Sequence, residues 1–253
     1  MNIDRTTIVI RERSLGELHD LALMLLRRHA GAVLALAVIG CAPFALLDWW
    51  LLSGVEPEWW ALHWWWLLLL VAVQGPLATA PLSAYLGSAV FEERPSIAAA
   101  LRAGFAAWRL LIVAGVVRGV CALIPPVLLA FPAHVVETRI LEGGSPWRRA
   151  AALRNVDGGA IALHWLVALL VAATAVLGTA GALHTLRSVL WPDGIGGSFW
   201  LWLDPGSAWM VLALWAAAVH LAIVRFLAYI DLRTRHEGWE LGLQLSRVGR
   251  RLS

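Results

Sequence analysis

Three ionisable side chains stand inside long apolar stretches of this sequence: Arg118, Glu137 and Arg225. A charge at membrane depth is costly unless it is paired, so each of the three is a functional-site hypothesis by default. Two arginines and one glutamate can neutralise one another between helices, and we favour such a structural ion-pair network. The same groups also suit a path for a proton or a substrate. Alternatively, the arginines only extend their guanidinium groups to the membrane surface.

A second group of charges ends the last long apolar stretch. Its members alternate along a short run: Tyr229, Asp231, Arg233, Arg235 and Glu237. Positive charge at the C-terminal end of a helix offsets the helix dipole. We therefore predict a local charge lattice that caps this helix at the membrane boundary, with docking of a partner as the alternative.

The histidines form no recognisable ligand or catalytic motif. His134 and Glu137 are three residues apart, but a di-metal bundle needs a second such pair and further carboxylates. His236 and Glu237 lack the second histidine of a zinc-protease motif, because Glu240 stands in its place. Nucleophile-elbow and phosphate-loop signatures are also missing. We expect no enzymatic activity, no metal and no cofactor.

The composition indicates where these residues sit. Of 253 residues, 60% are apolar and only 15% are charged, and the mean hydropathy is +0.73. These values exclude a cytosolic enzyme, a secreted disulfide scaffold and a nucleic-acid-binding module, and they predict an integral membrane protein. Cys41 and Cys121 fall inside apolar stretches and are interpreted as packing residues rather than a disulfide.

The apolar stretches have the length of membrane spans, about 20 residues each. They predict an all-α fold, a polytopic six-helix transmembrane bundle with interfacial amphipathic helices on the cytoplasmic face. Residues 1–253 form one integral membrane domain, with a cytoplasmic segment at 1–29 and a cytoplasmic amphipathic tail at 231–253. The predicted spans cover residues 30–52, 59–90, 108–124, 127–141, 159–185 and 207–230.

The arginines indicate the orientation of the spans, because basic flanks stay on the cytoplasmic side. With the N-terminus inside, every arginine outside the spans lies at the cytoplasmic face except Arg187. The absence of lysine, in a chain rich in Ala, Leu, Gly and Trp, suggests a GC-rich bacterial genome. We predict a bacterial inner-membrane protein with both termini inside. The N-terminal segment lacks the features of a signal peptide, so the first span is expected to direct insertion.

Tryptophans gather at the predicted outer ends of the spans, as at Trp49, Trp50, Trp65 and Trp66. The indole ring prefers the headgroup level, so we interpret them as an interfacial belt. The alternative is an aromatic surface for a lipid, a glycan or a protein on the outer side. Gly115 and Gly119 form a G-x-x-x-G pair, which indicates close helix contact inside the chain more often than dimerisation.

The cytoplasmic segments share an amphipathic pattern at residues 14–28, 95–109, 145–157 and 237–252. The pentapeptide Ala-Ala-Ala-Leu-Arg occurs twice, ending at Arg102 and at Arg154. We predict in-plane helices that bind anionic headgroups of the bilayer. Simple anchoring is the favoured role. The alternative is a docking ring for a cytosolic partner, formed by Arg102, Arg148, Arg149 and Arg154.

Several short motifs carry a family resemblance. They are Glu92-Glu93-Arg94-Pro95-Ser96, Glu142-Gly143-Gly144-Ser145-Pro146-Trp147 and, above all, the run from Tyr229 to Gly238. Over residues 14–240 the chain resembles the bacterial six-span family named after the membrane domain of glycerophosphoryl diester phosphodiesterases, related to the YciC-like membrane proteins. The resemblance implies a membrane domain without the catalytic domain, in assemblies with an ATPase and other membrane partners.

Three functions follow as hypotheses. The first is a non-enzymatic membrane component, a scaffold or assembly subunit of a bacterial inner-membrane complex, with protein partners in the membrane or cytoplasm and no nucleic acid. The second is a transporter or permease-like subunit for a lipid or small solute, which uses the predicted intramembrane charges. The third is an accessory to phospholipid metabolism, which the family resemblance alone implies.

Overall fold

The computed structural model describes residues 13–53, 60–92, 95–122, 134–142, 144–190 and 204–237. Within these ranges every regular element is a helix, so the prediction of an all-α protein is confirmed. The described helices are α1 (Leu15–Arg28), α2 (Ala30–Ser53), α3 (Trp60–Phe91), α4 (Ile97–Ala106), α5 (Trp108–Ala122), α6 (Val135–Leu141), α7 (Pro146–Leu190) and α8 (Ala208–Glu237).

Four of these helices are long and apolar enough to cross a membrane: α2, α3, α7 and α8. They coincide with the predicted first, second, fifth and sixth spans. Helices α4 and α5 pass the same test only as a pair, and they meet at a bend of 67°. The described part of predicted span four is the seven-residue helix α6, because residues 123–133 lie outside the described ranges. The structure thus supports a multi-pass membrane protein with four or five candidate spans in the described residues, and the count of six stays a prediction.

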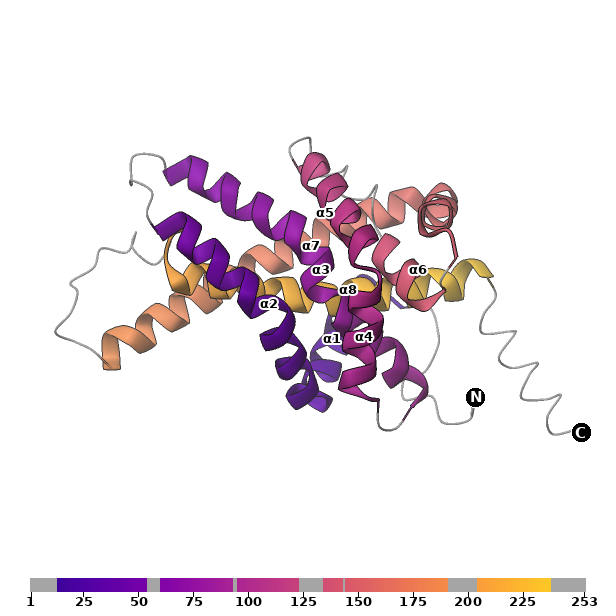
Figure 1. The fold of residues 1–253 in the computed structure, drawn as a ribbon, viewed down its shortest axis with the longest axis horizontal. Helices are drawn as coiled ribbons and strands as arrows, with labels where there is room; N and C mark the ends of the chain where they lie inside the picture. Colours follow the sequence, from indigo (N-terminus) through magenta and orange to yellow (C-terminus); the bar gives the residue numbers. More distant parts are fainter. Residues whose placement is uncertain are drawn as a thin grey trace, which may run out of the picture.

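The four long helices form two hairpins, α2 with α3 and α7 with α8. The connected ends of both hairpins lie at the same end of the bundle. In Figure 1 the C-terminal ends of α2 and α7 and the N-terminal ends of α3 and α8 all lie at the left of the view. Helix α6, the start of α7 and the end of α8 lie at the right. This placement agrees with the alternation that consecutive membrane spans require.

Helix α8 is the centre of the bundle. Helices α1, α2, α3 and α7 all pack against it. Its largest buried side chains, Phe226 and Tyr229, are fully inaccessible, and Met210 and Ile223 are equally buried. Because α8 is surrounded on most sides, a polar group on it needs a partner on a neighbouring helix.

Helix α1 forms where the sequence predicts it, but its apolar stripe faces the protein. Ser14 caps its N-terminus in a capping box with Glu17. The stripe of Leu18, Ala22 and Leu25 is buried in the main core. An apolar stripe can be buried against either lipid or protein, and here it packs against α2 and α8. The stripe of this predicted in-plane helix therefore packs on protein, and the position of α1 in the membrane plane stays a prediction.

The predicted third amphipathic segment, residues 145–157, is not a separate element. It is the first part of α7, which runs for 45 residues, and Ala150 and Leu153 on its apolar side are buried in the protein. Figure 1 shows the start of this helix nearly end-on and the rest across the view, so α7 changes direction. The candidate span begins at Gly158, as expected. Most of the fourth amphipathic segment, residues 237–252, lies outside the described ranges.

Small residues let α4 and α5 approach α3 closely. A Cβ atom added to Gly104 would collide with Pro81, and one added to Gly115 would collide with the Val73 backbone. Gly119 lies against the Val73 side chain in the same interface. The G-x-x-x-G pair therefore packs inside the chain, as the favoured interpretation holds.

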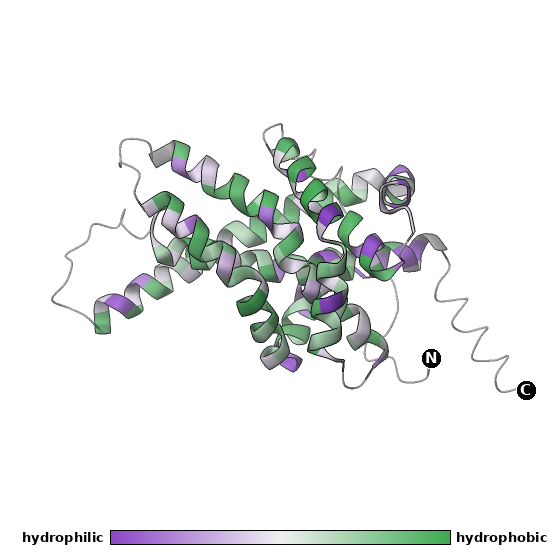
Figure 2. Cartoon of the chain, viewed as in Figure 1, coloured by the Kyte–Doolittle hydropathy of each residue, from purple (hydrophilic) through white to green (hydrophobic). Residues whose placement is uncertain are grey.

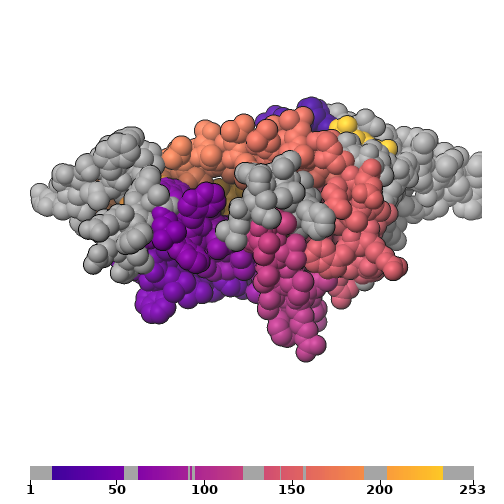
Figure 3. Space-filling model, turned by 90° about the horizontal axis from the view of Figure 1, so that it is seen from above, coloured from indigo at the N-terminus to yellow at the C-terminus, as the bar shows by residue number. Residues whose placement is uncertain are grey.

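Apolar side chains also cover much of the outside. Figure 2 shows hydrophobic colours along α2, α3 and α5, whereas hydrophilic residues gather near α6 and the C-terminal end of α8. Exposed examples are Leu34 and Trp50 on α2 and Leu170 and Val189 on α7. Figure 3 shows α5 projecting from the body of the molecule, on the side opposite the orange, later part of α7. Such faces suit contact with lipid rather than water.

Candidate functional site

The structure brings together the three predicted intramembrane charges around one small cavity. Glu137 comes from α6, Arg225 from α8 and Arg118 from α5. The Arg225 Nε donates to Glu137 Oε1 at 2.6 Å, and the two side chains are 8% and 0% exposed. A second Arg225 nitrogen lies 3.4 Å from the Thr79 hydroxyl of α3. The Arg225–Glu137 contact is a buried, charge-assisted hydrogen bond, which belongs to the strong class.

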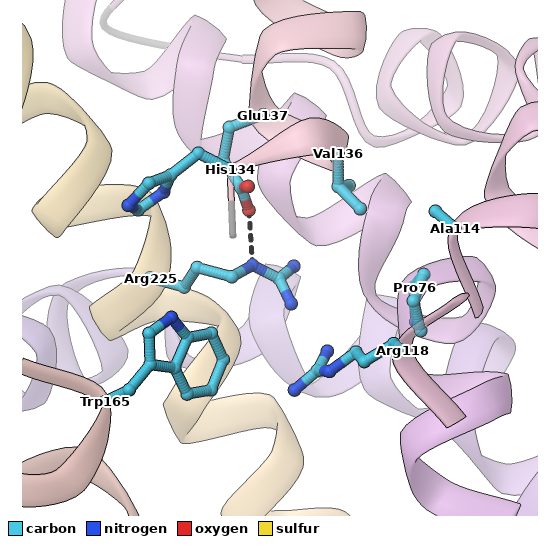
Figure 4. Close-up of a pocket in the computed structure, with 8 residues that line it drawn as sticks. All are labelled: Pro76, Ala114, Arg118, His134, Val136, Glu137, Trp165 and Arg225. Carbon is cyan, nitrogen blue, oxygen red and sulfur yellow. Dashed lines mark hydrogen bonds and ion pairs between the residues drawn. The ribbon is translucent and has the colours of Figure 1, made fainter. Parts of the chain in front are cut away.

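Arg118 reaches the same cavity from the opposite wall. Its guanidinium carbon lies 5.2 Å from the centre of the Trp165 ring on α7, which is the geometry of a cation–π contact. Figure 4 shows the terminal nitrogens of Arg118 and Arg225 pointing into one space. Glu137 bonds to Arg225 and not to Arg118 within the described chain. The geometry therefore consists of one ion pair and one stacked arginine, rather than a three-membered network.

The cavity is small. Its volume is about 10 Å³, which is the room that one water molecule needs. Two buried polar atoms on its lining residues, Glu137 Oε2 and His134 Nδ1, have no hydrogen-bond partner within the described part of the chain. The arrangement can hold one small polar species, and it has no room for a solute such as a sugar or an amino acid.

A second polar set inside the bundle was not predicted. Asp48 on α2 is fully buried, accepts from Gln74 Nε2 of α3 at 2.9 Å and accepts from Trp215 Nε1 of α8 at 3.0 Å. These bonds satisfy both carboxylate oxygens. The sequence signal for this set is an acidic residue about one turn inside a predicted span, directly before tryptophans of the predicted interfacial belt.

Three histidines also meet, although no sequence motif joins them. His19 of α1 lies 3.3 Å from His220 of α8, Nδ1 to Nε2, and its ring stacks on that of His164 of α7 at 6.5 Å. Burial lowers the pKa of His19, against an opposing effect of Asp20. Within the described ranges no group of His, Cys, Asp and Glu side chains has the geometry to hold a metal.

The charges at the end of α8 tie it to distant segments. Asp231 accepts the Arg13 backbone N–H at 2.8 Å and pairs with Arg235 Nε at 2.8 Å, while Arg235 also donates to the Arg13 carbonyl. These bonds fix the start of α1 on the end of α8. The Glu237 side chain lies outside the described part.

Glu142, which follows α6, joins the other members of this motif. It accepts a hydrogen bond from the Tyr229 hydroxyl and forms ion pairs with Arg149 at 2.9 Å and with Arg233 at 3.4 Å. The Arg233 guanidinium also lies 5.9 Å from the centre of the Tyr229 ring. These contacts join α6, α7 and α8 at one end of the bundle.

The four arginines of the predicted docking ring differ in their surroundings. Arg102 on α4 and Arg148 on α7 are exposed. Arg149 is engaged by Glu142, and Arg154 is partly exposed. Of these four, only Arg102 and Arg148 are in the exposed class, so a docking test is cleanest on these two.

A larger cavity lies near the C-terminal end of α8. It has a volume of about 270 Å³ between α1, α7 and α8, and its lining includes Leu18, His164 and Asp231. His134 lines both this cavity and the small charged one. The two cavities thus share one buried imidazole.

Comparisons with known proteins add no relative. No family model matches the chain, and neither a curated protein nor a solved structure matches it. The resemblance to the six-span family therefore stays a prediction, and the function rests on the geometry above.

Proposed function

We propose that this chain is a non-enzymatic component of a bacterial inner-membrane complex, a scaffold or assembly subunit with both termini in the cytoplasm. The main support is the contrast between its interior and its surface. The polar sets around Arg225 and Asp48 are bonded within the bundle, and the small charged cavity has room for only one water-sized species. Apolar helix faces and the charges of Arg102 and Arg148 point outward, where partners and anionic lipids bind.

The test is purification from native membranes in mild detergent, followed by mass spectrometry of the bound proteins. A stoichiometric partner is expected with the unchanged chain, and Arg102→Gln with Arg148→Gln should reduce its recovery. Both side chains are exposed, and the printed hydrogen bond of Arg102, from its Nε to the Ala98 carbonyl at 3.4 Å, lies within α4, so the double variant leaves the contacts between helices intact. Arg187→Gln, at the other end of α7, is the matched control. A chain that elutes without any partner under every mild condition would contradict the scaffold role.

The larger cavity favours a second candidate, a permease-like subunit for a lipid or small solute. A volume of about 270 Å³ approaches that of small-ligand sites, and apolar side chains form most of the lining. Leu163 lines this cavity and is exposed, so the cavity opens on the outer surface of α7.

A defined lipid or solute bound to the purified chain would support this second role. Leu163→Trp should then displace the ligand by covering the opening. Leu166→Trp is the matched control, because Leu166 is equally exposed on the same helix and does not line the cavity. Equal retention by both variants would argue against a ligand in this cavity.

A further inference from the structure

The small charged cavity holds more positive than negative charge. Arg118 and Arg225 both line it, and Glu137 is the only acidic residue of its lining within the described chain. Among the described residues, one positive charge of this lining is therefore left without a protein counter-charge.

The excess positive charge lies in a buried part of the bundle, where an unpaired charge costs free energy. Arg225 is almost fully buried, and its Nε is occupied by Glu137. Its terminal nitrogens face those of Arg118 across the cavity (Figure 4). Two guanidinium groups that share a space of low dielectric repel each other, and stacking on Trp165 offsets only part of this cost. A negative charge between them would turn the repulsion into two attractions.

We propose that this cavity is a binding site for one small inorganic anion of halide size, held between the guanidinium groups of Arg118 and Arg225. The volume of about 10 Å³ fits a single small sphere, so a halide is accommodated with a minor adjustment, whereas phosphate or a lipid headgroup is too large. The Thr79 hydroxyl, 3.4 Å from Arg225, keeps that guanidinium in place. Glu137 lines the same cavity, with Oε1 bonded to Arg225 and Oε2 without a partner in the described chain, so its carboxylate lowers the affinity of the site without cancelling the second positive charge.

This inference does not depend on the scaffold role. A bound anion serves a scaffold as a fixed structural counter-ion, and it serves a permease as cargo. The chemistry of recognition is the same in both cases: guanidinium donors around a water-sized space in an apolar surrounding.

The experiment is thermal unfolding of the full chain in detergent, first in gluconate and then with chloride or bromide added at constant ionic strength. Binding to the folded state alone raises the midpoint with saturation, by roughly 5 to 10 °C at a hundredfold excess over Kd. Sulfate and phosphate should give no such rise. Arg118→Gln should abolish the halide effect, Arg118→Lys should retain part of it, and Arg187→Gln, the control, should leave it unchanged.

Other results would overturn the proposal. An unfolding midpoint that does not respond to halides would show that the cavity binds no anion. A midpoint that rises equally with sulfate would show a general effect of salt rather than binding in the cavity. If only anionic lipid stabilises the protein, and Arg118→Gln removes this effect, Arg118 binds a lipid headgroup rather than a halide. Chloride-35 NMR line broadening provides a readout that needs no unfolding, and it should be present with the unchanged chain and absent with Arg118→Gln.

Discussion

At the scale of single residues, the buried charges of Arg225 and Asp48 are each accompanied by a specific set of donors and acceptors. Arg225 has Glu137 and Thr79, and Asp48 has Gln74 and Trp215. The partners come from helices far apart in the chain. Since an unpaired charge in an apolar surrounding costs several kcal/mol, these sets select one mutual arrangement of α2, α3, α6 and α8.

The buried ion pair allows a quantitative prediction. Glu137→Leu or Arg225→Met alone leaves one buried charge and should lower the free energy of unfolding by about 3 to 5 kcal/mol. The double variant removes both charges and should cost clearly less than the sum of the two. Equilibrium unfolding in detergent micelles measures all three. Additive losses would show that the two side chains do not act as a pair.

At the scale of the helices, close backbone contact decides how α5 sits on α3. Gly115→Ala places a methyl group against the Val73 backbone, which cannot move aside as a flexible side chain would. The free energy of unfolding should fall by about 1 to 3 kcal/mol. Gly178→Ala on α7 is the control, because nothing lies within 4 Å of an added Cβ. A loss of equal size in both variants would point to a general effect of glycine replacement.

Helix α1 carries a pH-dependent contact with α8. The pKa of His19 is lowered in the folded protein, so below about pH 6.5 the unfolded chain binds more protons and folding weakens. His164 and His220 face His19 from α7 and α8, and Asp20, the next residue on α1, opposes the lowering of the His19 pKa without overcoming the effect of burial.

We therefore expect the unfolding midpoint to fall as pH drops from 7 to 5. His19→Phe should reduce this fall, and His184→Phe, near the C-terminal end of α7, should not. Thermal scans of the three proteins at several pH values provide the measurement. A pH dependence that His19→Phe leaves intact would assign the effect to other groups.

At the scale of the whole molecule, the two long hairpins require the C-terminal end of α2 and the N-terminal end of α7 to face opposite sides of the membrane. Ser53 and Ser145 mark these two ends, and both are exposed. In a chain with Cys41 and Cys121 replaced by Ala, we expect Ser53→Cys to react with an impermeant maleimide in intact spheroplasts. Ser145→Cys should react only after permeabilisation. The reverse pattern would invert the predicted orientation, and labelling of both from one side would contradict the hairpins.

Much of this protein follows from local sequence. Hydropathy predicts the four long helices, the amphipathic pattern that begins at residue 14 predicts α1, and three charges inside apolar stretches predict a polar site. These features depend on a few neighbouring residues, because burial in lipid and helix capping are local requirements.

The tertiary structure alone decided which groups meet and what each apolar face covers. The stripe of α1 is buried in protein rather than lipid, because both are equally apolar and only packing distinguishes them. Asp48 meets Trp215, and His19 meets His220, across long separations in the chain that no periodicity reveals. Arg118 lines the same cavity as Arg225 yet forms no bond to Glu137 within the described chain, because the position of α5 is set by backbone contact at Gly115.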